Sequence, residues 1–389
     1  MTGLLRLAWR YVCHHRVRSG LLVGCIALTL VLPFATELLV AHYQRVMTAR
    51  AAATPLLAGA KGSRFDLLLS ALYFRGSVRD LLSMADLERV RDPELGLAIP
   101  LFRRHTARGY PVVGTTLDYL EFRGLRVAAG TPPLRLGDAV LGSGVAAALG
   151  LGPGDSLISD ARRLYDISAS YPLEMHITGV LAPARTADDG AVFVDLKTAW
   201  IIEGVGHGHQ EVSPDVDPAL VLERSGDNVA TNAAIVEYTR ITDANRASFH
   251  FHGGADSLPL TSILLSPRDA KAATILKGRL LASKNAQPLV PTESLAELLD
   301  IVFQVKRFFD AHLVMVSAAT VLFLVLVILL TVKVRQREID TLFKLGCSRA
   351  RVAQILATEL CLVIGAGVLL AASGAGLVYW ILRTYPLMP

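Results

Sequence analysis

The sequence predicts a membrane α-helical protein with three spans, a large extracytoplasmic α+β domain inserted between the first and second spans, and a helical stalk. With 52% hydrophobic residues, 19% charged residues and a mean hydropathy of +0.44, the chain is too apolar for an ordinary soluble domain. The excess lies in three runs, each close to the roughly 20 residues that a spanning helix needs. They are residues 20–40, interrupted only by Glu37, residues 313–332 and residues 360–382. This pattern excludes a purely soluble enzyme and a carrier with many spans.

The placement of charges orients the chain. Residues 1–42 carry a net charge of +3 and residues 311–389 carry +4, which leaves −2 of the total +5 for the middle of the chain. Because positive residues beside spans mark the cytoplasmic side, we expect the N-terminus and the loop between the second and third spans in the cytoplasm. The basicity is therefore juxtamembrane and does not indicate a nucleic-acid partner. These residues are Arg6, Arg10, Arg16 and Arg18, then Lys333, Arg335, Arg337, Lys344, Arg349 and Arg351.

The first span is preceded by residues 4–12, whose apolar side chains recur at helical spacing and predict an amphipathic helix on the inner leaflet. A signal peptide is the competing interpretation, but the apolar stretch is long and residues 34–37 form a poor cleavage site. Pro33 is expected to kink the span. Glu37 is either functional or reaches the outer headgroups. The cysteines lie in membrane or cytoplasmic parts, so we expect no disulfide in the outer domain: Cys13, Cys25, Cys347 and Cys361.

These observations divide the chain into consecutive segments. We expect a cytoplasmic amphipathic helix at 1–18, the first span at 19–41, a periplasmic α+β domain at 42–293, a stalk helix at 294–310, the second span at 311–333, a cytoplasmic coupling loop at 334–358, the third span at 359–383 and a periplasmic tail at 384–389.

Patterns within 42–293 mix both kinds of element. Alternating or β-branched runs predict strands, and helical spacing predicts helices. The expected strands are at 110–116, 175–181, 191–196, 218–222 and 262–265, and the expected helices are at 78–90, at 145–149 and from Asn228 onwards, with Asp227 as cap.

The stalk is predicted from apolar residues that step by three and four along the chain. Ser294 and Glu297 have the spacing of a capping box at its start. Because no Gly or Pro interrupts residues 294–332, we expect one helix of about 39 residues, roughly 58 Å long, that carries motion between the membrane and the outer domain. The alternative is a helix that packs on the domain and breaks at the membrane surface. The stepping residues are Leu295, Leu298, Val302, Val305 and Phe309.

The loop after the second span predicts a short helix at 335–345. Gly346 suits the residue that ends such a helix in a left-handed conformation, and Ser348 can cap the next helix. We expect this helix to offer apolar and charged side chains to a cytosolic partner.

Motifs for catalysis are missing from the sequence. There is no G-x-x-x-x-G-K-[ST] loop, because residues 59–63 lack its spacing, and no zincin helix, G-x-S-x-G elbow or Ca²⁺ loop. The chain is therefore not expected to be an enzyme, and any ATP is expected to be bound by a partner.

Two H-x-H pairs form the remaining chemical signal. On a strand, both histidines of such a pair point to one face, as two imidazole ligands of a borderline metal such as Zn²⁺ require. His176, Asp215 and Asp217 could add ligands. The sequence favours surface histidines in an exported loop, and a zinc site is the alternative. The four candidate ligands are His207, His209, His250 and His252.

Residues 335–348, R-Q-R-E-I-D-T-L-F-K-L-G-C-S, with 351–359 and the Gly-rich span that follows, resemble the signature of the MacB/FtsX/LolC-like (type VII) ABC transporter permeases. Residues 4–39 and 295–333 also fit this family, and residues 200–290 fit it least. Further similar stretches are 112–119, 139–155, 177–183 and 191–196.

The resemblance implies a non-catalytic permease subunit in a bacterial inner membrane. Such permeases pair with a cytoplasmic ABC ATPase, usually as two copies of each, and a homodimer is favoured here over a heterodimer. ATP hydrolysis drives conformational work of the periplasmic domain, or mechanotransmission, to export or extract a lipid, lipoprotein, peptide or metal-linked substrate, in some cases with a periplasmic partner. The implied ATPase-docking residues of this coupling helix are Arg337, Glu338, Leu342, Lys344 and Leu345.

The resemblance departs from the family at its end. Family members usually have a fourth span, whereas this sequence ends after residues 383–389. Either the family core tolerates three spans, or another subunit supplies the fourth, or the chain is shortened and compromised. The alternative function is a membrane-anchored periplasmic binding or sensor protein that signals without ATP and binds metal.

Overall fold

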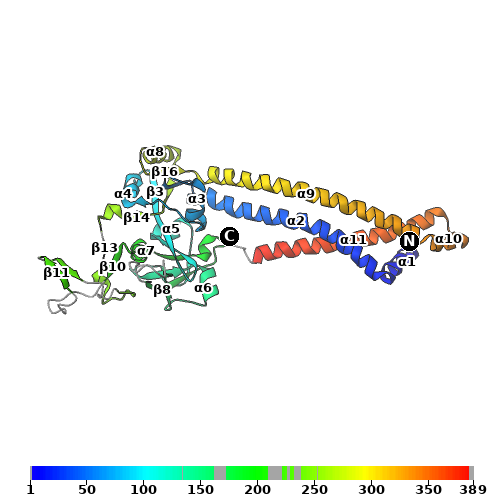
Figure 1. Cartoon of the computed structure of the whole chain (residues 1–389), viewed down its shortest axis with the longest axis horizontal. Coiled ribbons are helices and arrows are strands. Elements are labelled where there is room, and N and C mark those ends of the chain that lie inside the picture. The colour runs from blue at the N-terminus through cyan, green and yellow to red at the C-terminus, as the bar shows by residue number, and fades with distance from the viewer. Residues whose placement is uncertain are drawn as a thin grey trace. The chain divides into compact units, whose positions relative to one another are not determined.

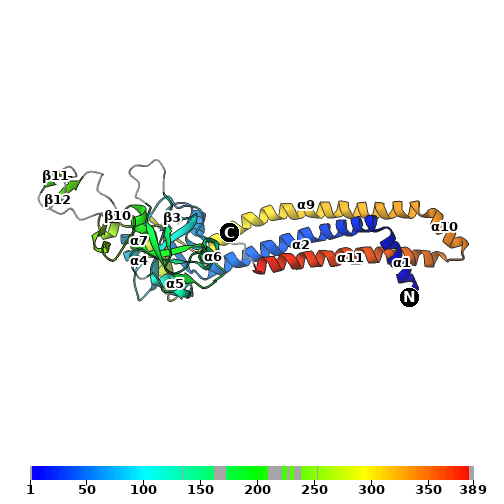
Figure 2. The same cartoon turned by 90° about the horizontal axis from the view of Figure 1, so that it is seen from below.

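The computed structural model describes residues 2–133, 135–161, 172–208, 221–225, 228–231, 238–251 and 253–384. The chain divides into two compact units. The helical unit comprises Met1–Val46 and Leu299–Leu387, and the sheet unit comprises Met47–Leu298. Figures 1 and 2 show the long helices of the first unit and the strands of the second.

The helical unit contains α1 (Thr2–His14), α2 (Arg16–Ala52), α9 (Pro291–Val334), α10 (Gln336–Lys344) and α11 (Arg349–Thr384), of which α2 and α9 also extend into the sheet unit. Among the described residues, three helices are long and apolar enough to cross a membrane, namely Arg16–Ala52, Pro291–Val334 and Arg349–Leu382. They contain the three apolar runs found in the sequence. In both views α2, α9 and α11 run alongside one another within the helical unit (Figures 1 and 2).

The helix α9 is continuous, as expected, but it begins at Pro291 rather than at Ser294. Proline suits the first turn because its φ is already helical and no N–H is lost from the ladder. The Ser294 amide donates to the Val290 carbonyl at 3.2 Å, so the predicted capping box at Ser294 is wrong. Glu297 instead pairs with Arg64 at 3.4 Å. The side chains of Val302 and Val305 lie outside the described ones.

Small residues bring α11 close to α2. A Cβ on Gly367 would lie 2.7 Å from Ile26 Cγ2, and Ala371 is buried. Gly376 has open space around it, so only part of the small-residue stripe lies at this contact. On α2, Glu37 forms an ion pair with Lys306 of α9 at 2.8 Å.

The sheet unit is built on a mixed sheet, and ten strands of the described residues belong to it. Along the sheet the order is β16-β1-β15-β3-β4-β9-β6-β8-β5, with β7 pairing with β8. The pairs β4–β9 and β6–β8 are parallel and the others antiparallel. The bounds are β1 Leu56–Ala60, β3 Gly96–Ala107, β4 Tyr110–Thr115, β5 Val127–Gly130, β6 Asp138–Leu141, β7 Ser156–Ile158, β8 Glu174–Leu181, β9 Val192–Asp195, β15 Ser262–Pro267 and β16 Ala286–Leu289.

Both faces of this sheet are covered. In β9, Val192 and Val194 belong to the large core cluster, whereas Phe193 between them points the other way and meets Phe74 and Tyr119. Because both faces of the sheet are buried, side chains that point to either face are apolar. The strands β1, β4, β6 and β9 are therefore nearly continuous apolar runs. The helices of the unit are α3 Arg64–Tyr73, α4 Met84–Val90, α5 Leu117–Phe122, α6 Ser143–Leu149, α7 Leu196–Glu203 and α8 Ala270–Leu281.

The strands expected near 110–116, 175–181, 191–196 and 262–265 are present, as is the helix near 145–149. Only Met84–Val90 of the expected helix at 78–90 is helical, after the short strand β2 (Leu82–Ser83), which pairs with β14 (Pro259–Leu260). The helix expected from Asn228 is wrong. Asn228–Thr231 forms β12, which pairs with β11 (Val221–Ser225), so the β-branched Val229 and Thr231 follow their strand preference. Residues 218–220 and Asp227 lie outside the described residues.

The end of α2 is held in the sheet unit by a buried ion pair. Arg50 donates to both carboxylate oxygens of Asp188, at 2.6 and 2.9 Å, and to the Tyr119 hydroxyl at 3.0 Å and the Leu72 carbonyl. Tyr119 Oη donates to Asp188 at 2.6 Å. The Asp188 side chain is 1% exposed and that of Arg50 6%. Because both charges are shielded from water, each is stabilised by the opposite charge of its partner.

Replacing Asp188 by Asn leaves the Arg50 guanidinium buried without its counter-charge. We expect D188N to lower the free energy of unfolding by about 3–5 kcal/mol. Urea unfolding of the detergent-solubilised full chain, followed by tryptophan fluorescence, measures this, since Trp200 lies in the sheet-unit core. The matched control is E88Q, because the Glu88–Arg91 pair is half exposed and is worth less than about 1 kcal/mol. Equal losses of unfolding free energy in D188N and E88Q would contradict the conclusion that the Arg50–Asp188 pair stabilises the sheet unit.

The same carboxylate predicts a pH dependence. Burial alone raises the pKa of Asp188, but the charge and hydrogen bonds of Arg50, with those of Tyr119 and Thr186, lower it to about 2 from the ordinary 3.8. The stabilisation is therefore complete above about pH 4 and is lost as the pH falls toward 2. We expect the difference in unfolding free energy between wild type and D188N to shrink by at least about 1 kcal/mol over that range. A difference independent of pH would contradict this, since other carboxyl groups titrate in both proteins.

Candidate functional site

The signature segment forms a short helix with defined ends. Arg335 separates α9 from α10 (Gln336–Lys344), and Gly346 has φ +87°, in the left-handed region. The Gly346 amide donates to the Phe343 carbonyl and the Cys347 amide to the Leu342 carbonyl, both at 3.0 Å. This pair of bonds is the Schellman termination of a helix. The Ser348 hydroxyl accepts from the Arg351 amide at 3.3 Å and caps α11. The expected roles of Gly346 at the end of α10 and of Ser348 at the start of α11 are therefore confirmed.

Arg335 fastens this helix to the rest of the unit. Its guanidinium bonds Glu359 of α11 at 2.8 Å and Glu338 of α10 at 3.0 Å, and lies 3.7 Å from the centre of the Tyr11 ring of α1. Burial alone lowers the pKa of Arg335, but its hydrogen bonds to the two carboxylates outweigh burial and raise it. Arg335 is 11% exposed and Glu359 12%. Three helices therefore meet at one nearly buried cation.

The five residues assigned to docking are divided between two surfaces of α10. Glu338 and Leu342 line a groove that α1 shares through Leu7, Arg10, Tyr11, Cys13 and His14. Arg337, Lys344 and Leu345 are exposed, and Leu345 is 76% exposed. Leu345 directly follows the exposed Lys344, so an apolar and a cationic side chain are both accessible there.

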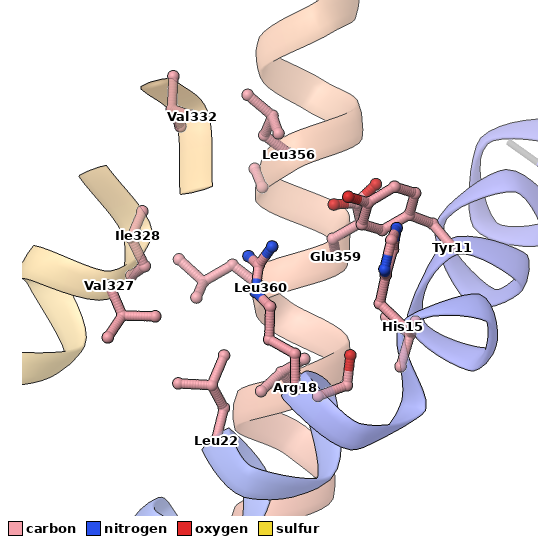
Figure 3. A pocket seen from close by; sticks show the side chains of 14 residues that line it. Tyr11, His15, Arg18, Leu22, Val327, Ile328, Val332, Leu356, Glu359 and Leu360 are labelled. Carbon is pink, nitrogen blue, oxygen red and sulfur yellow. The ribbon is translucent and has the colours of Figure 1, made fainter. Parts of the chain in front are cut away.

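A cavity of about 180 Å³ lies inside the helical unit beside this anchor (Figure 3). Figure 3 shows Val327, Ile328 and Val332 of α9 on one side and Tyr11, His15 and Glu359 on the other. Arg18 also reaches the cavity from α2. Its lining is therefore apolar toward α9 and polar toward α1.

The structure brings two of the four candidate metal ligands together. His207 is in β10 (Gly206–Gly208) and His250 in β13 (Phe249–Phe251), and these antiparallel strands place the two residues directly opposite each other. Their ring centres are 4.9 Å apart. His209 and His252 lie outside the described residues, as do Asp215 and Asp217, and His176 is in β8 of the large sheet. Among the described residues, no group of three or more His, Cys, Asp or Glu is placed to hold a metal ion.

Sequence reasoning missed the contacts that Arg335 and Arg50 make. Arg335 was assigned as a positive charge beside a span and as the first residue of the short helix. Its partner Glu359 lies 24 residues further along the chain, and Tyr11 lies near the N-terminus. Arg50 ends a helix whose apolar run stops near Val40, so nothing in the local pattern marks it. The one available signal was the single acid, Glu359, at the start of an otherwise uncharged run.

Comparisons with known proteins do not establish a family for this chain. No protein-family model matches the chain, and no curated protein matches its sequence. Solved structures that match in part are the periplasmic region of MacB from Actinobacillus actinomycetemcomitans (TM-score 0.37, 11% identity, 64% of this chain and 95% of that one) and the extracellular domain of the noncanonic ABC-type transporter YknZ from Gram-positive bacteria (0.33, 10%, 60% and 98%). A third is a domain of a permease protein from Porphyromonas gingivalis (0.27, 10%, 60% and 85%). TM-scores this low do not establish a shared fold, so the proposals below rest on this chain's own residues.

Removing the Arg335 side chain should loosen α10. In R335L, Glu359 loses its buried partner, at a cost of roughly 1–3 kcal/mol, so amide exchange across residues 336–347 should become about tenfold faster or more. Hydrogen exchange with mass spectrometry on the full chain in detergent measures this. The control is R337L, which removes the same charge from an exposed position of the same helix. Equal exchange in the two variants would show that Arg335 does not anchor α10.

Proposed function

We propose that this chain is the membrane subunit of an ABC transporter, a permease of the MacB/FtsX/LolC-like type that couples ATP hydrolysis by a separate cytoplasmic ATPase to work by its sheet unit. The observation that carries the proposal is α10. The residues that resemble the family signature form a separate helix with a Schellman end, an anchored start and exposed Arg337, Lys344 and Leu345.

The proposed orientation follows from charge. The basic residues of α1 and of the α9–α11 connection lie beside the apolar helices, so by the positive-inside rule α10 is cytoplasmic. Residues 47–298 then lie on the other side of the inner membrane. A partner that binds ATP would reach the chain at α10.

The route of force in this proposal is α9. It begins at Pro291, contains no Gly or Pro after that position, and ends at Val334, one residue before α10. Leu295, at its start, is buried in the sheet unit. A helix without a break transmits displacement along its axis better than a jointed one, so movement of α10 would be felt at Leu295. The anchor formed by Arg335 keeps α1, α10 and α11 moving as one body.

Two chains are proposed to act together, as a homodimer with two ATPases. The work delivered is export or extraction of a lipid, lipoprotein, peptide or metal-linked substrate. A membrane-anchored sensor or binding protein that uses no ATP is the competing function, and it requires a cytosolic partner without a nucleotide-binding domain.

Charge reversal on α10 tests the docking surface. We expect R337E/K344E to reduce at least tenfold the amount of ATPase that copurifies with the full chain, because two cations facing the partner become anions. Candidate cytoplasmic ABC ATPases are each co-expressed with the chain, and the assay is pull-down from mild detergent.

The matched control is K271E/K284E, which makes the same change of charge at two exposed lysines of the sheet unit. It should leave copurification unchanged. Because all four positions are exposed, both variants keep the fold, and their unfolding curves should coincide with wild type. Undiminished recovery of the ATPase with R337E/K344E would reject α10 as the docking helix.

A further inference from the structure

The ribbon formed by β10 and β13 has two chemically different faces. Its strands read Gly206-His207-Gly208 and Phe249-His250-Phe251, and Gly206 lies opposite Phe251 and Gly208 opposite Phe249. A Cβ on Gly206 would lie 2.6 Å from the Phe251 ring, and one on Gly208 would lie 2.6 Å from the Phe249 ring. Each glycine therefore leaves the space that a phenylalanine ring fills.

The phenylalanine face attaches the ribbon to the sheet unit. Phe251 packs edge-on against Trp200 with ring centres 6.1 Å apart, and Phe249 contacts Tyr238 at 6.4 Å. Both phenylalanines pack against the core cluster. Because side chains alternate along a strand, His207 and His250 lie on the opposite face, where His250 is exposed and His207 half-buried.

The two imidazoles are placed as a pair. Residues directly opposite in an antiparallel ribbon have Cβ atoms about 4.5–5.5 Å apart, and here the ring centres are 4.9 Å apart. His250 Nδ1 is 3.1 Å from the Ser248 carbonyl oxygen, which can only accept, so Nδ1 carries the proton. The lone pair of neutral His250 is then on Nε2. A histidine that ligates a metal usually donates its other ring N–H to just such a carbonyl.

We propose that His207 and His250 form a two-histidine site for a borderline divalent transition metal, such as Zn²⁺ or Cu²⁺. Imidazole nitrogens are the ligands these ions prefer over the hard ions Mg²⁺ and Ca²⁺. Within the described residues, these two histidines are the ligands that the ribbon places opposite each other. The ribbon supplies rigidity, because its phenylalanine face is fixed to the core. This proposal is independent of the permease function.

The order of affinity is fixed by ligand chemistry. Cu²⁺ should bind more tightly than Zn²⁺, and Mg²⁺ should not bind.

The test uses the full chain in detergent, purified without a histidine tag and stripped of metal, and titrated with Cu²⁺ and Zn²⁺ by calorimetry. Wild type should bind one equivalent that H207Q and H250Q each weaken at least tenfold. The control is H176Q, which removes an exposed histidine of β8. Glutamine keeps the size and polarity of the side chain, and the phenylalanine face is untouched, so tryptophan fluorescence should show the native fold in all three.

Pulsed electron paramagnetic resonance of the Cu²⁺ form supplies a second readout. It should show coupling to imidazole nitrogen in wild type and in H176Q, and a reduced coupling in H207Q. Binding that is equal in wild type and H207Q, as with metal held by the cysteines, would overturn the proposal. So would a wild-type chain that binds neither ion.

Discussion

Arg50 is a cation buried in the last turn of α2, and several segments of the sheet unit are held in place by the groups that neutralise its charge and accept its hydrogen bonds. Asp188, Tyr119 and the Leu72 carbonyl come from three separate parts of the chain and all bind it. Burying such a charge costs several kcal/mol unless its partners are exact in position. The turn at Asp188, α5 and the end of α3 are therefore constrained together. The same contact fixes the end of α2 to the face of the sheet that Phe193 and Phe74 cover.

Arg335 plays a similar part in the helical unit. In both places a guanidinium, with several donors in one plane, joins helices that apolar packing alone would leave free to slide. In the proposed function, the exposed residues of α10 bind the ATPase while the anchored residues keep the helix in place. The proposed transmission of force through α9 requires both, since a docking helix that pivoted on its turn would absorb the displacement.

Local chemistry made much of the architecture predictable. Three apolar runs, Gly346 at the end of α10 and Ser348 as a cap follow from propensity and hydrogen bonding within a few residues. The start of α9 was misplaced because Ser294 has the residues of a capping box, whereas Pro291 already fits the first turn. Asn228 was assigned to a helix because Asp227 before it has the residue type of a helix cap, whereas Asn228–Thr231 pairs with the adjacent strand β11. The sequence analysis considered what two H-x-H pairs would do on strands but predicted no strand there, and only the register shows that His207 meets His250. The pairing of Arg50 with Asp188 and of Arg335 with Glu359 was missed because these acids lie far away in sequence.

The central claim is that this chain works with a cytoplasmic ATPase. The most direct test is the rate of ATP hydrolysis by the candidate ATPase. This rate is measured with nanodiscs that contain this chain and with empty nanodiscs. The account predicts that turnover depends on the chain, and that particle images of the active sample show two copies of each subunit. Turnover that is the same in empty nanodiscs, with a chain that remains alone, would contradict the account and favour the sensor function.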